Sequence, residues 1–259
     1  FCAIAEHTAR ESGDPSRPVF NTDAFPPELR DVDSAAVARF REQHAHDVGF
    51  HEWLQFELER QLQTVQATAR NAGMAIGLYG DVAVGNAPGS SDVWSMPDAF
   101  ATGVCLGAPP DAFSADGQSW GLAPLVPSRL RASGYSYFSE LCRAAMRHVG
   151  MVRIDHVMGL LRQFWVPDGA TAKQGAYVRF PFEDLAGIVA LESQRAGTLV
   201  IGEDLGLVPA GLRSHVLYFE REGDGSFTRP DGYSRASLAT INTHDLPPLA
   251  GYVSGHDPD

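Results

Sequence analysis

The chain has 259 residues, of which 44% are hydrophobic and 20% charged, an ordinary globular composition that excludes wholesale disorder and collagen-like or coiled-coil repetition. Its 20 Lys and Arg against 32 Asp and Glu give a net charge of -12, which disfavours nucleic acid and anionic membranes as partners. Three cysteines without a CxxC pair, no apolar run of 18 residues and no basic leader predict a cytoplasmic protein without a disulfide framework.

The N-terminal third is predicted to be irregular first and helical afterwards. Residues up to about Glu28 are rich in Pro, Ser, Asp and Thr, which is typical of a connecting segment. From Ser34 to Ala69 apolar residues recur at helical spacing, which predicts two helices with a break near Gly49. The apolar run at 74–85 ends in a polar turn and predicts a buried strand.

Residues 85–128 are rich in Gly, Pro, Ser and Asp but also carry scattered aromatic residues: Trp94, Phe100, Phe113 and Trp120. A stretch of this length inside a compact domain is either functional or disordered, and disordered segments contain few aromatic residues. We therefore expect an ordered loop that covers a substrate.

The remainder alternates between helical and strand-like segments. Helices are predicted for Tyr137 to His148 and Phe182 to Arg195, and strands for 151–157, 198–205, 215–219 and 239–246. Such alternation predicts an α/β fold with a parallel sheet, and short buried strands are typical of a (β/α)8 TIM barrel. The five candidate strands are too few to close that barrel, so we expect residues 1–259 to form one catalytic barrel domain that is incomplete at both ends.

Acidic residues and histidines end three of the predicted strands: Asp155 and His156, then Glu203 and Asp204, then His244 and Asp245. Parallel neighbouring strands bring such ends together on one face. Converging carboxylates suit glycoside chemistry, which needs a nucleophile, a proton donor and a group that holds the distorted sugar.

Arg153 lies two residues before Asp155 and therefore on the same face of the strand. A neighbouring guanidinium favours the ionised form of a carboxylate, so Asp155 is the expected nucleophile and Glu203 the proton donor. We expect no cofactor, and the histidine-rich segment 44–51 is predicted to be a solvated helix edge.

Two alternatives remain open at this point. Carboxylates and imidazoles at strand ends also bind metals, so a metal-dependent barrel hydrolase is a second hypothesis, with these ligands: Asp155, His156, Glu203, His244 and Asp245. A non-catalytic glucan-binding fragment is a third.

Several motifs resemble those of the 4-alpha-glucanotransferases called amylomaltases or disproportionating enzymes, glycoside hydrolase family 77. The resemblance runs from about Val32 to Tyr252, and its motifs are GLYGDVAVG, GAPPDAFSADGQSWGLAP, VRIDHVMGL, VIGEDLG and NTHDLP. It is strongest to the bacterial branch that metabolises maltodextrins. Members of this family are much longer, so the chain is expected to be a central fragment.

The resemblance implies a retaining enzyme that transfers alpha-1,4-glucan segments between maltodextrins, which serve as donor and acceptor. It assigns Asp155 as nucleophile, Glu203 as acid/base and Asp245 as transition-state stabiliser. The residues that it implies in substrate binding are Arg153, His244, Asp81, His156 and, in the loop Gly107 to Gly121, Asp111, Gln118 and Trp120.

Overall fold

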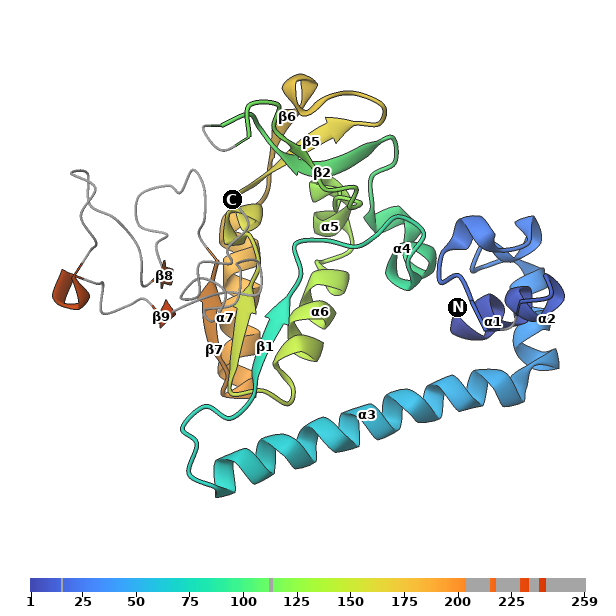
Figure 1. The fold of residues 1–259 in the computed structure, drawn as a ribbon, viewed down its shortest axis with the longest axis horizontal. Helices are drawn as coiled ribbons and strands as arrows, with labels where there is room; N and C mark the ends of the chain where they lie inside the picture. The colour runs from blue at the N-terminus through green and yellow to red at the C-terminus, as the bar shows by residue number, and fades with distance from the viewer. Residues whose placement is uncertain (15, 112–113, 204–214, 218–228, 233–237, 241–259) are drawn as a thin grey trace, which may run out of the picture.

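The computed structural model describes residues 1–14, 16–111, 114–203, 215–217, 229–232 and 238–240 (Figure 1). The helices in these ranges are α1 (Cys2–Glu11), α2 (Ala35–Gln43), α3 (Ala45–Asn71), α4 (Ser91–Ser95), α5 (Pro127–Ala132), α6 (Ser136–Met146) and α7 (Phe182–Ala196). The strands are β1 (Tyr79–Val82), β2 (Val104–Ala108), β3 (Gln118–Ser119), β4 (Met151–Ile154), β5 (Arg162–Pro167), β6 (Ala176–Arg179), β7 (Leu199–Gly202), β8 (His215–Leu217) and β9 (Leu238–Thr240). The chain therefore has the predicted α/β fold.

A parallel sheet of order β1-β4-β7 lies at the centre of the fold (Figure 1). Its register places Asp81 beside Arg153 and Arg153 beside Ile201, so the three strands end at the same level. These strands confirm the predictions for 151–157 and 198–205. The strand predicted at 74–85 is present as β1, but its residues are exposed or half-buried, so the expectation of a buried strand was wrong. The segment 215–219 contains β8, and the segment 239–246 overlaps β9, which starts one residue earlier; the two strands also pair in parallel.

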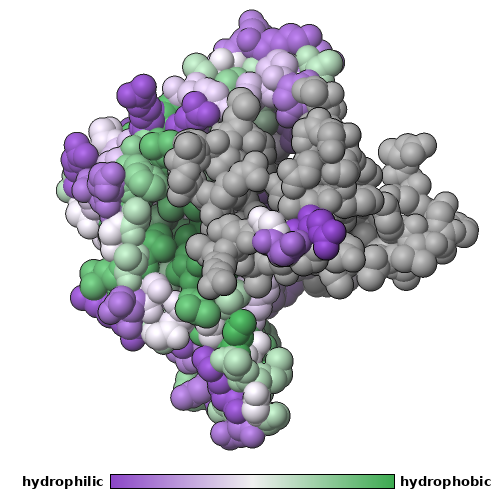
Figure 2. All heavy atoms as spheres, turned by 90° about the vertical axis from the view of Figure 1, so that its left-hand side faces the viewer, coloured by the Kyte–Doolittle hydropathy of each residue, from purple (hydrophilic) through white to green (hydrophobic). Residues whose placement is uncertain are grey.

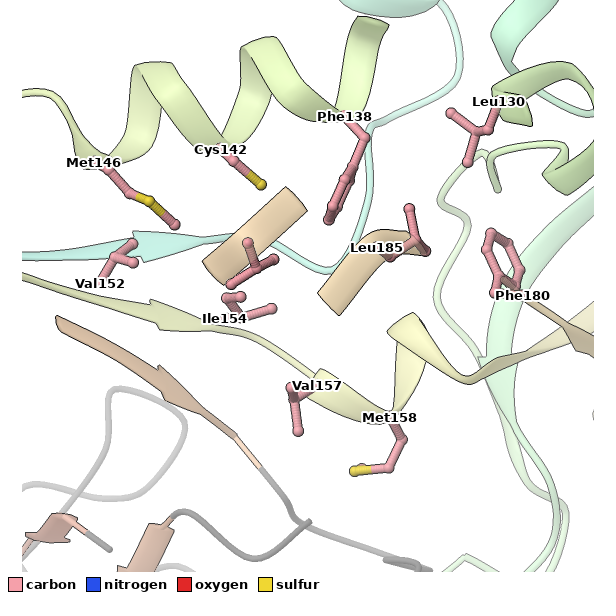
Figure 3. Packing of buried hydrophobic residues seen from close by; sticks show 11 residues of the cluster. Leu130, Phe138, Cys142, Met146, Val152, Ile154, Val157, Met158, Phe180 and Leu185 are labelled. Atoms are coloured by element: carbon pink, nitrogen blue, oxygen red, sulfur yellow. The ribbon is translucent and has the colours of Figure 1, made fainter. Parts of the chain in front are cut away.

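One face of the parallel sheet carries the hydrophobic core. Val152 and Ile154 of β4 point toward α6 and α7, where Phe138, Met146 and Leu185 pack against them (Figure 3). Successive side chains of a strand point to opposite faces, so the neighbouring residues of β4 face away from these helices. The alternation of β4 thus separates the core from the face that carries charge.

An ion pair between a buried carboxylate and a half-exposed arginine joins the two helices that cover this core. Glu192 of α7 is 3% exposed, and its Oε1 atom lies 2.9 Å from Arg143 Nη2 of α6 and 2.8 Å from Arg195 Nη1. The hydrogen bond from Arg143, reinforced by the one from Arg195, outweighs the effect of burial and lowers the pKa of Glu192. The pair therefore fixes α6 against α7.

The segment 85–128 is not the single long loop that its composition predicts. It contains α4, β2 and β3, and β2 pairs with β5 in an antiparallel sheet of order β3-β2-β5-β6. The strand β2 pairs with residues about 60 positions away, and such a long-range partner leaves no mark on the local pattern. The two halves of this sheet are insertions that follow β1 and β4.

The N-terminal helices also differ from the predictions. Residues 2–11 form α1 rather than an irregular segment, because Ala3, Ile4 and Ala5 bury a small apolar face against Phe25 and Phe40. The helix break after α2 falls at His44 rather than near Gly49. His44 stacks on Phe40 with a 4.2 Å centroid distance, and this packing fixes the bend one turn before the glycine.

The long helix α3 extends away from the sheet (Figure 1). Glu59 ties it to the end of α6 through Arg147, and Gln66 accepts a hydrogen bond from Leu78 N. None of its 27 residues is buried, and its exposed large hydrophobic residues are Phe50, Trp53, Leu54, Phe56, Leu58, Leu62 and Val65. No helix within the described ranges combines the length and hydropathy needed to cross a membrane.

The contact between β7 and the turn after β4 yields a stability prediction. A Cβ atom at Gly202 would lie 2.7 Å from Val157 Cβ, whereas one at Gly187, in the interior of α7, would meet nothing within 4 Å. We expect Gly202→Ala to lower the free energy of unfolding by about 1–3 kcal/mol. Gly187→Ala, the matched control, is expected to raise it by about 0.5–1 kcal/mol. Urea unfolding measures both, and equal effects would contradict the packing.

The Glu192 pair yields a pH prediction. Because its folded pKa lies below the ordinary 4.5, Glu192 stabilises the fold above that pH, and the stabilisation is lost as the pH falls through the folded value. Glu192→Gln should therefore destabilise the protein by about 1–3 kcal/mol at pH 7 and by progressively less below pH 4.5. Glu42→Gln, at an exposed position of α2, is the control. A Glu192→Gln deficit that is constant from pH 7 to 3 would contradict the prediction.

Candidate active site

Arg153 occupies the centre of the charged face of the parallel sheet. Its Nη1 atom lies 2.8 Å from Asp81 Oδ2, and its Nη2 atom lies 2.6 Å from Asp155 Oδ1. Burial lowers the pKa of Arg153, but the charges of Asp155 and Asp81 more than offset this, and the net pKa is raised. The guanidinium therefore stays charged and holds two carboxylates from neighbouring strand ends in fixed positions.

Glu203 follows β7 as Asp155 follows β4, so both carboxylates stand at the carboxyl ends of adjacent parallel strands. Ile154 lies beside Gly202 in the register, and Glu203 N donates to Ile154 O at 2.8 Å. Glu203 is 5% exposed, and its Oε2 atom accepts a hydrogen bond from His156 N at 3.0 Å. The structure thus brings Asp155 and Glu203 to the same edge, as the sequence predicts.

His156 has an unusual backbone conformation. Its φ of 46° and ψ of 58° lie in the left-handed region, which residues other than glycine rarely adopt. Its ring lies edge-on to Trp120 at a centroid distance of 5.3 Å. Burial lowers the pKa of His156, and the charge of Asp155 opposes this only in part, so the imidazole is neutral at pH 7.

Trp120 reaches the strand ends from the antiparallel sheet. Trp120 N donates to Leu106 O at 2.8 Å, and its indole Nε1 donates to Gln118 Oε1 at 2.8 Å. The structure therefore brings Gln118, Trp120 and His156 together. Asp111 lies earlier in this loop, where its Oδ1 atom accepts a 2.7 Å hydrogen bond from Ser114 N and closes a turn.

A cavity of about 110 Å³ adjoins Asp155 and His156. Most of its lining residues are apolar and come from several segments, among them the stretch after β1, α6 and the turn after β4, and Gln163 of β5 adds a polar group. Gln163 Oε1 is buried and has no hydrogen-bond partner among the described residues. Asn86 and Tyr137 also line the cavity, where Asn86 donates to Tyr137 OH, and burial raises the pKa of Tyr137, which keeps that hydroxyl protonated.

The sequence does not predict two features of this site, Tyr79 and the backbone amide of His156. Tyr79 precedes Asp81 by two residues on β1 and is about half exposed. Its partial burial raises its pKa, and of the two nearby charges Arg153 opposes this and Asp81 adds to it. The alternation of side chains along a strand could have indicated Tyr79, because it lies on the same face of β1 as Asp81. The backbone amide of His156 left no such signal, because a residue's identity does not reveal where its N–H points.

Several predicted residues lie outside the described ranges: Phe113, Asp204, His244 and Asp245. Within those ranges no group of three or more His, Cys, Asp and Glu side chains is arranged to hold a metal ion. The histidine-rich segment is only partly the solvated edge that was predicted. His46 is fully exposed, but His51 is mostly buried and its Nε2 atom lies 3.4 Å from Glu6 Oε2 of α1.

The proteins similar to this chain share one description, 4-alpha-glucanotransferase. The family profile described as 4-alpha-glucanotransferase, glycoside hydrolase family 77, matches residues 1–258. The 4-alpha-glucanotransferase of Mycobacterium tuberculosis H37Rv is 44% identical over 245 residues, which cover 89% of this chain and 34% of the relative. That of Haemophilus influenzae is 44% identical over 219 residues, covering 81% and 31%. The chain thus spans about a third of the length of these curated relatives.

Solved structures of similar fold are amylomaltases. The crystal structure from Corynebacterium glutamicum is matched with a TM-score of 0.78 and 37% identity over 82% of this chain and 32% of that one. The Streptococcus agalactiae amylomaltase in complex with acarbose gives the same TM-score at 21% identity, over 98% of this chain and 54% of that one, which supports the fold alone. Because the family profile covers nearly every residue, the chain belongs to glycoside hydrolase family 77, the 4-alpha-glucanotransferases.

Proposed function

We propose that this chain carries the nucleophile and the acid/base of a retaining 4-alpha-glucanotransferase that moves alpha-1,4-glucan segments between maltodextrins. The observation that supports this most directly is the pair of carboxylates at adjacent strand ends. Asp155 is held by Arg153, and Glu203 is buried and hydrogen-bonded beside it. The named relatives share the activity by title.

The proposed reaction has two displacements at one anomeric carbon. In the first, an Asp155 oxygen bonds to that carbon while the glycosidic bond breaks, and Glu203 gives its proton to the leaving oxygen. In the second, a hydroxyl of the acceptor glucan gives its proton to Glu203 and displaces Asp155. Arg153 holds an oxygen of Asp155 in place for the attack. The proposal gives Asp245 the role of stabilising the charged transition state.

We further propose that the parallel sheet is part of a (β/α)8 barrel, that residues 1–259 belong to that one domain, and that longer chains of the family complete it. The open sides of the structure support this. The apolar side chains of α3 and the half-exposed Leu199 of β7 have no cover among the described residues. Hydrophobic residues also gather in a hollow on the side of the molecule shown in Figure 2.

The proposed glucan contacts surround the strand ends. Arg153 and Asp81 line the charged face of the sheet, and Gln118, Trp120 and Asp111 belong to the insertion after β1. His156, whose ring lies against Trp120, and His244 and Asp245 complete the proposed set. A flat indole face stacks on sugar rings, and neutral maltodextrins are compatible with a net charge of -12.

Substitution of the two carboxylates tests the proposed reaction in the intact enzyme. Glu203→Gln should lower transfer from maltodextrin donors by about 10²–10⁴-fold, because the proton donor is lost. A glycosyl fluoride donor needs little acid assistance and should still form the glycosyl-enzyme. Asp155→Ala should abolish reaction with both donors. Rates of maltodextrin redistribution and of fluoride release provide the measurement.

Asp168→Asn, on the exposed turn after β5, serves as the control and should leave both rates unchanged. Substantial transfer by Asp155→Ala would show that another group is the nucleophile. Loss of activity on dialysis against a chelator, with recovery on addition of zinc or manganese, would favour the metal-dependent hydrolase instead.

We also propose that the insertion 85–128 covers the acceptor side and excludes water. Its pairing with β5 and the 2.6 Å ion pair between Lys173 and Asp116 support a fixed cover. Trp120→Ala should then lower the ratio of transfer to hydrolysis more than it lowers total cleavage, because water gains access to the glycosyl-enzyme. Glucose release and maltodextrin redistribution are measured together, with the melting temperature as a control. An unchanged product ratio with a lower melting temperature would mean that Trp120 only anchors the insertion.

A further inference from the structure

We propose that His156 is a positioning residue whose left-handed backbone, rather than its imidazole, orients Glu203 for proton transfer. The proposal rests on the role given above to Glu203. His156 directly follows the proposed nucleophile, and its role depends on its backbone conformation. For Glu203, the imidazole acts only by stabilising that conformation.

The backbone geometry carries the argument. His156 N donates to Glu203 Oε2 at 3.0 Å, and the next amide, Val157 N, donates to Glu203 O at 2.9 Å. Two consecutive amides thus bind one residue, at its side chain and at its carbonyl. Successive extended residues present their amides to opposite sides, so this double contact depends on the turn at His156, where φ is 46°.

The surroundings hold a conformation that costs free energy for a residue with a Cβ atom. Gly159 N donates to His156 O at 2.7 Å, and the indole of Trp120 lies edge-on to the imidazole. On the other side, Val157 packs against the bare Cα of Gly202. Three separate segments, the residue that follows β3, the strand β7 and the turn after β4, therefore stabilise the orientation of one amide.

The consequence for the reaction is specific. An amide that donates to a carboxylate fixes the direction of that oxygen and favours the ionised form. Burial lowers the pKa of His156, so its ring adds no positive charge beside Glu203 at neutral pH. His156 therefore acts on the proton donor through its oriented N–H. The insertion after β1 acts on Glu203 indirectly, because its Trp120 contacts His156.

Four substitutions at one position separate backbone from imidazole. His156→Gly and His156→Asn remove the imidazole but adopt the left-handed region readily, whereas His156→Ala and His156→Val remove it and resist that region. In the intact enzyme we expect kcat/KM for maltodextrin to be about tenfold lower for Ala and Val than for Gly and Asn. With a glycosyl fluoride donor, which needs little acid assistance, the four variants should react alike.

The pH profile supplies a readout that a loss of packing would not move. The alkaline limb of kcat/KM reports the proton donor of the free enzyme. Loss of the donated hydrogen bond lets the acid keep its proton to higher pH, so the limb should move upward for Ala and Val and stay in place for Gly and Asn. Melting temperatures show whether each variant folds. If His156→Val does not fold, the comparison of His156→Gly with His156→Ala tests the proposal by itself.

Equal kcat/KM values and equal alkaline limbs for Gly and Ala would overturn the proposal, since the backbone would then have no part in the reaction. Glu203→Gln, measured alongside, separates this failure from a failure of the proposed function. If Glu203→Gln is inactive with maltodextrin while the His156 variants are all equal, only the positioning role is lost. If Glu203→Gln remains fully active, Glu203 is not the acid and both proposals fall.

Discussion

The arrangement of the site depends on Arg153, a buried guanidinium held between two carboxylates of neighbouring parallel strands. Its contacts with Asp81 and Asp155 link β1 to β4 across the charged face of the sheet. On the other face Val152 and Ile154 pack under α6 and α7. A buried charge is tolerated only when it is paired. The strand β4 therefore has to place its ion pairs on one face and its hydrophobic core residues on the other.

The insertions after β1 and β4 show how function is added to this framework. Each leaves the sheet at the carboxyl end of its strand, and the two meet in one antiparallel sheet through the pairing of β2 with β5. That pairing brings Trp120 to the ring of His156. The scaffold fixes the carboxylates, and the loops determine what surrounds them, which is the usual division of roles in parallel α/β proteins.

The free surfaces of the chain are consistent with its position within longer relatives. The apolar stripe of α3 is exposed along much of its length, and the chain covers about a third of the curated relatives. An amphipathic helix gains most of its stability from packing of its apolar face. The ion pairs of Glu59 and the hydrogen bonds of Gln66 hold α3 by its polar side instead.

The sequence by itself determined the elements with a local signature. The strands at 74–85, 151–157 and 198–205 and the helix beginning at Phe182 follow from periodicity, and the placement of Arg153 beside Asp155 follows from alternation. Tertiary structure decided the rest. The antiparallel sheet depends on contacts between residues far apart in the chain, α1 is stabilised by Phe25 and Phe40, and the bend at His44 follows from stacking. The amide that His156 directs at Glu203 belongs to this second group, because backbone direction is set by neighbouring elements and not by the identity of the residue.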